Sequence, residues 1–347
     1  MKELPSPSQY LQHKLETCGQ YTLTESDHAL LKEKGMEEFL YAKLTSKKFR
    51  KWRITQKAED RIRNALSVTV PKNKPLQLRF PFGAYKLWRL PSSPEVDWAE
   101  FFTLAYFSEF LAPILAAYQP GVELYFSSDE VIVEPMNNVS REETDAYQES
   151  FRRLLAEFKK YWPNNFIVDI RPVRNLYNNA EEIFNEAQQM IPIIEERYAA
   201  MSKEEVASAE KTSAMNIRWD GVQDWQKLTE DEKKEKIHYG TILHDAYCAI
   251  SKRQQFMRSD DTILLFVNRQ VSDGIPLGST KNSIAKFWPG YGVLEQKEAG
   301  YIERVLTPQQ LTSLQHEKAQ IEAIDWLPMK NFHEIQVYPE LNFTLTK

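Results

Sequence analysis

The sequence predicts an α/β layered fold, and the clearest observations come from residues 76–170. Residues 76–80 alternate between apolar and polar side chains like a strand, and residues 122–126 and 165–170 also have strand character. Helical patterns separate these strands. An order of strand, helix, strand, helix, strand is typical of layers in which helices cover a sheet.

The two intervening helices have signals of their own. Proline and acidic residues at 93–97 favour a helix start, and the apolar side chains of residues 101–111 span too wide an arc for a surface helix. Residues 140–143, Ser-Arg-Glu-Glu, form a capping-box pattern that is followed by apolar side chains at helical spacing over residues 147–158. We therefore expect one covered helix and one amphipathic helix.

The flanking regions complete the expected organisation. Residues 1–75 are mostly polar with helical spacing, and they predict a helical N-terminal region. The α/β core is expected over residues 76–299, with a helix-rich insertion at about residues 175–243. Residues 300–347 are expected to form a helix near residues 307–324 and a tail that packs on the core.

Composition narrows the class of protein. The 347 residues are 42% hydrophobic and 27% charged, which is ordinary for a globular protein with a sizeable core. The formal net charge is -5 without a long basic block, so the footprint of a nucleic-acid binder is missing.

Cysteine usage and hydropathy suggest a compartment. Cys18 and Cys248 are the only cysteines, and no Cys-x-x-Cys pair occurs, which suits a reducing cytoplasm. The most apolar stretch, residues 101–118, is interrupted by Glu109 and Pro113, and the first residues have no signal-peptide pattern. We expect a cytoplasmic protein that does not bind a membrane.

Polar residues follow the strand at residues 122–126. Ser127, Ser128 and Asp129 come before a second β-branched run, residues 131–133. Ligands of open α/β sheets bind at the carboxyl ends of strands, which predicts a pocket here. The alternative is a hairpin turn whose Ser and Asp side chains cap their own backbone.

Cations and aromatic side chains also gather in the segment after the first predicted strand. Tyr85, Lys86, Trp88 and Arg89 follow the strand at residues 76–80, where the cations either grip an anion or lie over apolar surface.

A further pair of cations follows a later strand, expected over residues 261–268. Arg269 comes at the end of this strand, and Lys281 follows a Gly/Ser/Pro-rich loop. The two resemble an anion clamp. Glu100, in the first turns of its helix, is either a partner for a nearby cation or a solvated acid.

The sequence lacks the motifs of several common kinds of binding site and active site. The chain has no Gly-x-Gly-x-x-Gly after a strand, no Walker-type loop, no zinc-binding histidine spacing and no serine nucleophile elbow. We therefore expect neither a metal nor a cofactor. What remains suits binding and acid/base handling of a small anionic substrate.

The ordered segments together resemble the isonitrile synthase family, which includes pyoverdine/dityrosine biosynthesis proteins. Residues 78–82, Leu-Arg-Phe-Pro-Phe, are similar to a family strand ending in Phe-Pro-Phe-Lys-Ser-Pro-Asn. Residues 118–121 and Ser128-Asp129 resemble its Tyr-Pro-Pro-Gly and Ser-Asp-Gly, and residues 244–247 its Arg-Ser-Glu-Ala-Tyr. Residues 278–284 are similar to its Gly-x-x-Lys-x-x-Ile.

The chain departs from the family pattern at three places. Residues 83–86, Gly-Ala-Tyr-Lys, replace Lys-Ser-Pro-Asn. Residues 266–269, Phe-Val-Asn-Arg, replace Ser-Ile-His-Pro, and residues 288–291, Trp-Pro-Gly-Tyr, replace a Thr-Pro-Trp-His stretch. The family histidines are therefore missing, and a non-catalytic member that binds a small anionic ligand or a partner is the alternative to an active enzyme.

The resemblance implies a Rossmann-like core, here a mixed sheet flanked by helices, and condensation of an amino-acid amine with the ketone of ribulose 5-phosphate without metal or nucleotide. The catalytic candidates are Asp129, Glu100, Lys281 and Tyr247, and the substrate-binding candidates are Lys86, Arg89, Tyr85, Trp88, Ser127, Ser128, Asn268, Arg269 and Trp288. The expected partners are an amino acid and a sugar phosphate, with a homodimer left open.

Overall fold

A parallel sheet of five strands forms the centre of the computed structural model, which describes residues 4–87, 94–267, 272–314, 319–339 and 341. Its strand order is β3-β2-β1-β4-β5. All its pairs are parallel, with Leu76 opposite Val122 and Val122 opposite Phe166. The bounds are β1 (Leu76–Phe82), β2 (Val122–Ser128), β3 (Phe166–Ile170), β4 (Thr262–Val267) and β5 (Ile275–Leu277). The predicted α/β layering is confirmed.

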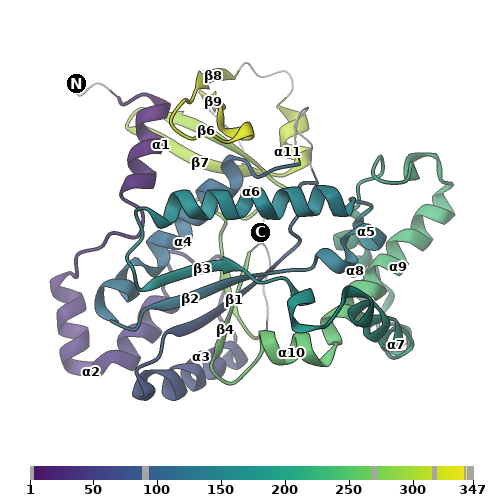
Figure 1. Ribbon diagram of the computed structural model, residues 1–347, viewed down its shortest axis with the longest axis horizontal. Helices are drawn as coiled ribbons and strands as arrows, with labels where there is room; N and C mark the ends of the chain where they lie inside the picture. The colour runs from purple at the N-terminus through teal and green to yellow at the C-terminus, as the bar shows by residue number, and fades with distance from the viewer. Residues whose placement is uncertain (1–3, 88–93, 268–271, 315–318, 340, 342–347) are drawn as a thin grey trace.

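Helices cover both faces of this sheet (Figure 1). On one face lies α3 (Gln56–Thr69), and on the other lie α4 (Trp98–Ala117) and α6 (Arg141–Lys159). The side chains of Asp97 and Ser140 cap α4 and α6, each in a capping box. Helix α4 is apolar on all sides because it is buried almost throughout, as expected from its sequence. It is long and apolar enough to cross a membrane, yet 89% of its most apolar window is buried inside the protein, as in the core helix of a globular fold.

A second sheet packs against the outer side of α4. Its strand order is β7-β6-β9-β8, and it combines parallel and antiparallel pairs. The bounds are β6 (Tyr291–Lys297), β7 (Gly300–Leu306), β8 (Gln320–Ala323) and β9 (Glu334–Tyr338). Gly292 lets β6 lie directly on the start of α4, because a Cβ atom there would come within 2.3 Å of backbone atoms of Trp98 and Ala99. The mixed pairing therefore lies in this second sheet.

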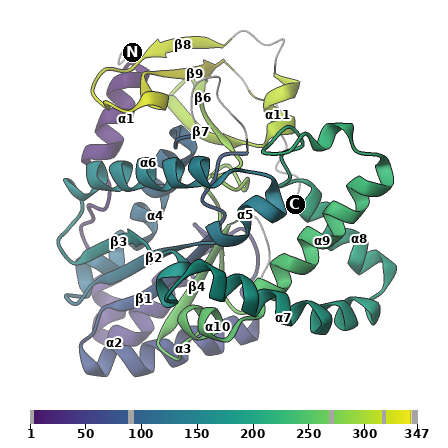
Figure 2. The ribbon, with the colours of Figure 1, turned by 45° about the vertical axis from the view of Figure 1, so that its right-hand side comes forward.

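The remaining helices form two groups. The N-terminal group is α1 (Pro7–Glu16), α2 (Glu25–Leu44) and α3, which confirms the helices predicted there. The second group lies beyond the carboxyl ends of the central strands (Figure 2). It consists of α5 (Glu130–Asn137), α7 (Ala180–Ala199), α8 (Lys203–Ala214), α9 (Glu230–Ala249) and α10 (Ser251–Met257). Short 3₁₀ helices are found at Val70–Lys72, Val173–Leu176, Trp225–Lys227 and Lys330–Phe332.

Two predictions of secondary structure are wrong. Residues 131–133 lie in α5 rather than in a strand, because the chain turns at Asp129 and buries Ile132 against Leu243 and Tyr247 of α9. The helix expected over residues 307–324 is only α11 (Pro308–Ser313). Residues 320–323 form β8 instead, since their backbone pairs with β9.

Candidate functional site

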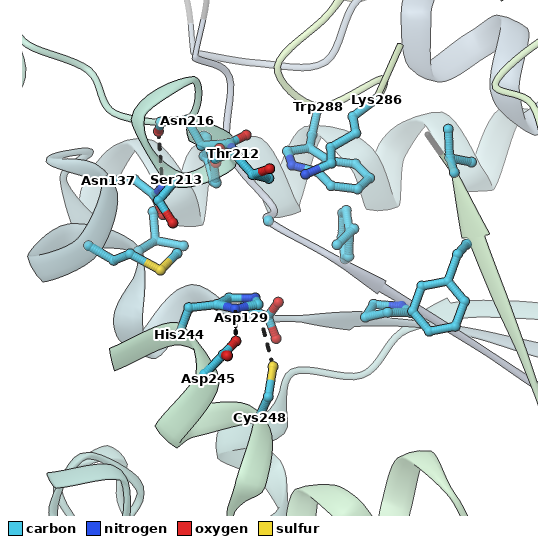
Figure 3. A pocket seen from close by; sticks show the side chains of 18 of the residues that line it. Asp129, Asn137, Thr212, Ser213, Asn216, His244, Asp245, Cys248, Lys286 and Trp288 are labelled. Carbon is cyan, nitrogen blue, oxygen red and sulfur yellow. Dashed lines mark hydrogen bonds and ion pairs between the residues drawn. The ribbon is translucent and has the colours of Figure 1, made fainter. Parts of the chain in front are cut away.

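A cavity of about 270 Å³ opens at the carboxyl end of the central sheet. Figure 3 shows many of the side chains around it. They come from β1 and its loop, β4, the segment after β2, helices α5, α8, α9 and α10, and the loop before β6. The lining residues are Pro81, Phe82, Gly83, Tyr85, Asp129, Val133, Met136, Asn137, Thr212, Ser213, Asn216, His244, Asp245, Cys248, Arg253, Met257, Arg258, Phe266, Val267, Lys286 and Trp288.

Sheet topology explains why the cavity lies here. Strand order runs from β1 to β2 and β3 on one side and to β4 and β5 on the other, so the order reverses between β1 and β4. Connections leave the sheet in opposite directions at such a point, and the crevice between them is the usual ligand site of open α/β sheets. Residues at the ends of both β1 and β4 line this cavity.

One wall of the cavity is aromatic. Tyr85 and Trp288 are almost fully buried, and both side chains pack against Gly83. A Cβ atom at Gly83 would come within 2.3 Å of the Tyr85 ring and 2.8 Å of Trp288 Nε1, so only glycine allows the two rings to approach. Ala84 adopts a left-handed conformation with φ 55°, which turns the chain away from β1. The wall offers apolar and stacking surface to a ligand.

The opposite wall carries a polar cluster on α9. The Sγ atom of Cys248 lies 3.7 Å from Nε2 of His244, and Nδ1 of His244 lies 3.2 Å from Oδ1 of Asp245. His244 and Cys248 are four residues apart, which puts their side chains on the same helical face. Figure 3 shows both of them at the cavity, with the Asp129 carboxylate beside the imidazole. This arrangement can hold a thiolate next to an imidazolium.

Arg253 and Asp129 form a buried ion pair next to this cluster. Nη2 of Arg253 lies 3.2 Å from Oδ1 of Asp129, and the Arg253 side chain is only 4% exposed. The Arg253 guanidinium also lies 4.9 Å from the centre of the Tyr247 ring. Its positive charge therefore reaches the cavity from behind Asp129.

Neighbouring charges give the Cys248 thiol a pKa that differs from that of an ordinary thiol. Burial by itself raises the pKa of Cys248, but the positive charges of Arg253 and His244 outweigh burial and bring this pKa below its usual value. The neighbouring thiolate, together with Asp245, raises the pKa of His244 to about 10. Both shifts favour the ion pair over the neutral thiol and imidazole.

Two further cations line the cavity. Nε of Arg258 lies 2.7 Å from Oδ2 of Asp273, and its Nη1 donates to Gln254 at 3.2 Å. Nζ of Lys286 lies 5.6 Å from the centre of the Trp288 ring. With Arg253 and His244, these side chains make the cavity a place where an anionic group can bind.

A second cluster of charges lies deeper in the protein. Nζ of Lys86 contacts carboxylate oxygens of Asp97 at 3.2 Å and Glu100 at 2.9 Å, and it donates to the carbonyls of Phe287 and Gly290. The Tyr147 hydroxyl donates to Glu100 at 2.9 Å. Burial raises the pKa of Glu100 to about 8 and also raises that of Asp97, although Lys86 opposes both shifts. This closed cluster joins the loop after β1, the start of α4, helix α6 and the loop before β6.

The sequence profile of the pyoverdine/dityrosine biosynthesis proteins matches residues 86–259, which is half of the chain. The chain belongs to this family. Membership confirms the resemblance found in the sequence and relates the chain to isonitrile synthases of secondary-metabolite biosynthesis. The matched segment includes Asp129, His244, Cys248, Arg253 and Arg258.

A solved structure agrees on the fold. The chain is similar to the crystal structure of the PvcA protein from Pseudomonas aeruginosa, with a TM-score of 0.61 and 15% sequence identity. The similarity covers 87% of this chain and 99% of that chain. At this identity the likeness concerns the fold. Among curated proteins, no match is found.

Three residues predicted from the family resemblance line the cavity. Tyr85 and Trp288 form its aromatic wall, and Asp129 pairs with Arg253 at its polar side. Asp129 and Tyr85 were expected at strand ends, Trp288 came from the family comparison, and the structure brings the three together at the cavity. Their roles toward a substrate stay predictions.

Lys86 was expected to bind substrate and Glu100 to take part in catalysis, and the structure places both elsewhere. Neither lines the cavity, because each is held by the other in the closed cluster. Lys86 is 2% exposed and already has four oxygen partners, so it offers no charge to a phosphate in this structure. The cations that line the cavity come from α9, α10 and the loop before β6 instead.

Four other predicted residues, all of them described, lie outside the cavity lining. Ser127 and Ser128 end β2 inside the protein, where Ser128 donates to Glu130, and Tyr247 is buried beneath α5. Lys281 is exposed, and its carbonyl accepts a hydrogen bond from Lys51. Trp88, Arg89, Asn268 and Arg269 lie outside the described residues.

Sequence reasoning missed the His244–Cys248 pair and Arg253. One signal was available, because a histidine and a cysteine four residues apart in a predicted helix must share a face. Nothing local marked Arg253, whose importance depends on contact with Asp129, 124 residues earlier. In the described part of the chain, no group of three His, Cys, Asp or Glu side chains has an arrangement that could hold a metal ion.

Proposed function

We propose that this protein is an isonitrile synthase-like enzyme that condenses the amine of an amino acid with the ketone of a ketose phosphate, ribulose 5-phosphate. The observation that carries the proposal is the cavity at the reversal of strand order, with cations on one side and an aromatic wall on the other. A substrate pair that joins a phosphate to an amino-acid side chain needs both surfaces.

The phosphate group is assigned to two cations that line the cavity, Arg258 and Lys286. Arg258 is oriented by Asp273 and Gln254, and Lys286 lies over Trp288 at the other side of the cavity. A guanidinium and an ammonium suit phosphate oxygens, the first by its planar fork and the second as a point charge. The amino-acid side chain is assigned to Tyr85 and Trp288.

Proton transfers are assigned to the polar wall. Imine formation between an amine and a ketone requires a group that accepts a proton from the amine and one that protonates the carbonyl oxygen. Asp129 and His244 lie side by side at the cavity, as Figure 3 shows, and can fill these roles. No metal or nucleotide is required for these steps.

Turnover tests the proposal directly. The purified chain is incubated with ribulose 5-phosphate and pooled amino acids, and phosphate release and an isonitrile product are measured. We expect both products to form together. Absence of both, with no binding of ribulose 5-phosphate by calorimetry, would contradict the proposal.

A matched pair of variants locates the phosphate site. Arg258→Met should weaken the apparent affinity for ribulose 5-phosphate by about tenfold or more, because one charge-assisted contact is lost. Arg63→Met is the control, since Arg63 is an exposed α3 residue paired with Glu38. Binding of the sugar phosphate without turnover would favour the non-catalytic alternative.

A further inference from the structure

We propose that Cys248 is a nucleophile that adds, as its thiolate, to an electrophilic carbonyl carbon of a ligand held in the cavity. The nucleophile itself is inferred from the geometry of α9 and α10. The identity of the carbonyl compound, a ketose phosphate, rests on the proposed function.

The first support is the arrangement of Cys248, His244 and Asp245. His244 faces Cys248 through Nε2 and Asp245 through Nδ1, so the carboxylate fixes the ring in the orientation that presents Nε2 to sulfur. Asp245 is itself held by Tyr198, whose hydroxyl donates to it at 3.0 Å, and by an ion pair with Arg197. A nucleophile, its base and an orienting carboxylate are thus all in place.

Arg253 gives independent support. It is a second cation beside the sulfur, and its side chain is more than nine-tenths buried while lining the cavity. Its Nε atom is buried and has no hydrogen-bond partner among the described residues, so this guanidinium is only partly satisfied by the protein. A buried guanidinium needs negative charge nearby, and here it has the Asp129 carboxylate on one side and the Cys248 sulfur close by.

The other cysteine shows what an unactivated thiol is like in this protein. Cys18 is buried in the main hydrophobic core, and burial raises its pKa to about 12. The cation near Cys18 is Lys14, whose charge lowers the pKa far less than burial raises it. Cys18 is therefore an unactivated reference thiol in the same chain, although its burial in the core also limits access by a reagent.

The covalent step balances without a further reactant. The Cys248 thiolate attacks the carbonyl carbon, a C–S bond forms, and the C=O π electrons move to oxygen. The Nε2–H of the His244 imidazolium donates its proton to this oxygen. The result is a neutral hemithioketal and a neutral imidazole, with no change in oxidation state. Reversal of the same step frees the carbon for attack by an amine.

Alkylation kinetics test the thiolate without any substrate. Iodoacetamide reacts with the thiolate and releases iodide, and peptide mass spectrometry reports each cysteine separately. At pH 7 Cys248 should react at least about tenfold faster than Cys18, with a rate that levels off below the usual thiol range near pH 8.5. His244→Gln should slow the alkylation of Cys248 at pH 7. At high pH, where the thiol ionises without help from His244, the variant should be alkylated as fast as the wild type.

The titrating and charged groups around the sulfur define the controls. They are His244, Asp245 and Tyr247 on α9, Arg253 on α10 and Asp129 after β2. Asp245 positions the His244 ring. Asp245→Asn should therefore shift the pH profile of Cys248 alkylation in the same direction as His244→Gln, but by less. Cys18→Ala should leave the Cys248 profile unchanged, and circular dichroism checks that each variant is folded.

A reactive ketone tests the ligand class. The probe is 1-chloro-3-hydroxyacetone phosphate, whose carbon next to the ketone forms a stable thioether with a thiolate as chloride leaves. Cys248 should be modified faster by this probe than by chloroacetamide, and ribulose 5-phosphate should protect it.

The possible outcomes separate the two proposals. Fast iodoacetamide labelling without protection by ribulose 5-phosphate would keep the nucleophile and contradict the ketose phosphate. An ordinary thiol profile for Cys248, or isonitrile formation by Cys248→Ser at the wild-type rate, would overturn the nucleophile and leave the condensation standing. We expect Cys248→Ser to reduce turnover by about 10²-fold or more, as for other essential catalytic groups.

Discussion

Two buried groups of charges lie near the carboxyl end of the central sheet, and they differ in what surrounds them. In the closed cluster, Lys86 has four oxygen partners and does not line the cavity. In the open cluster, Arg253, His244 and Cys248 all line the cavity, and the Nε atom of Arg253 has no hydrogen-bond partner in the described residues.

The difference separates a structural role from a functional one. Buried charges whose hydrogen bonds are all made within the protein join elements together, while buried charges that face a cavity keep capacity for a ligand. The closed cluster links four segments that surround the aromatic core. The open cluster has the composition of a site that holds an anion and moves protons. Variants in the closed cluster should therefore mainly affect stability, and variants in the open cluster should mainly affect ligand binding and turnover.

The largest effect on stability is expected for Lys86→Met. This change leaves Asp97 and Glu100 buried without their cation, and breaking a buried ion pair in this way costs about 3–5 kcal/mol. Urea unfolding followed by tryptophan fluorescence measures the loss. A loss below about 1 kcal/mol would show that the closed cluster does not hold the fold together.

Asp129→Asn should have a smaller effect on stability. Arg253 loses a charge-assisted hydrogen bond, which is worth about 1.5–3 kcal/mol, and the cavity can admit water to the guanidinium. Turnover should fall more than stability does, because Asp129 faces the ligand. If Asp129→Asn instead destabilises the protein as much as Lys86→Met, the two clusters do not differ in the way described.

Gly83→Ala should perturb the aromatic wall. The new Cβ would overlap with the Tyr85 ring and Trp288, and overpacking costs roughly 1–3 kcal/mol. We expect a value in the lower half of that range, since both side chains border the cavity and can move into it. Apparent affinity for the amino acid should decrease, whereas affinity for the sugar phosphate should change little. Calorimetric titration with each substrate separates these outcomes.

The pH dependence of the closed cluster is a separate test of the comparison. The pKa of Glu100 is raised from 4.5 to about 8, so the folded state holds this proton more tightly than the unfolded state does. The free energy of unfolding should therefore fall as pH rises from about 4.5 to 8. Glu100→Gln should make this decline shallower. An unchanged slope in the variant would indicate that Glu100 is ionised throughout this range.

Local sequence patterns were sufficient for much of the fold. The capping residues Asp97 and Ser140 are found where the sequence predicts helix starts. These signals are reliable because each depends on side chains within one turn of the backbone they cap. Residues 131–133 misled the prediction, since their β-branched side chains suit either a strand or a buried helix.

The site was only partly predictable. The rule that ligands gather at strand ends led to Asp129, and the family resemblance led to Tyr85 and Trp288. The same reasoning placed Lys86 in the pocket, where the structure instead pairs it with Asp97 and Glu100. A cation near a strand end looks the same in sequence whether its partner is a ligand or a buried carboxylate.

The order of strands and helices, the helix caps and the family of this protein can all be read from its sequence, because each depends on neighbours in the chain or on an ordered series of motifs. Which charges are closed off and which face a cavity depends on contacts across long sequence separations. Lys86 meets the carbonyl of Gly290, and Arg253 meets Asp129, only after the layers have packed. That packing sets the burial and the neighbouring charges, and these in turn set the pKa of Glu100, His244 and Cys248.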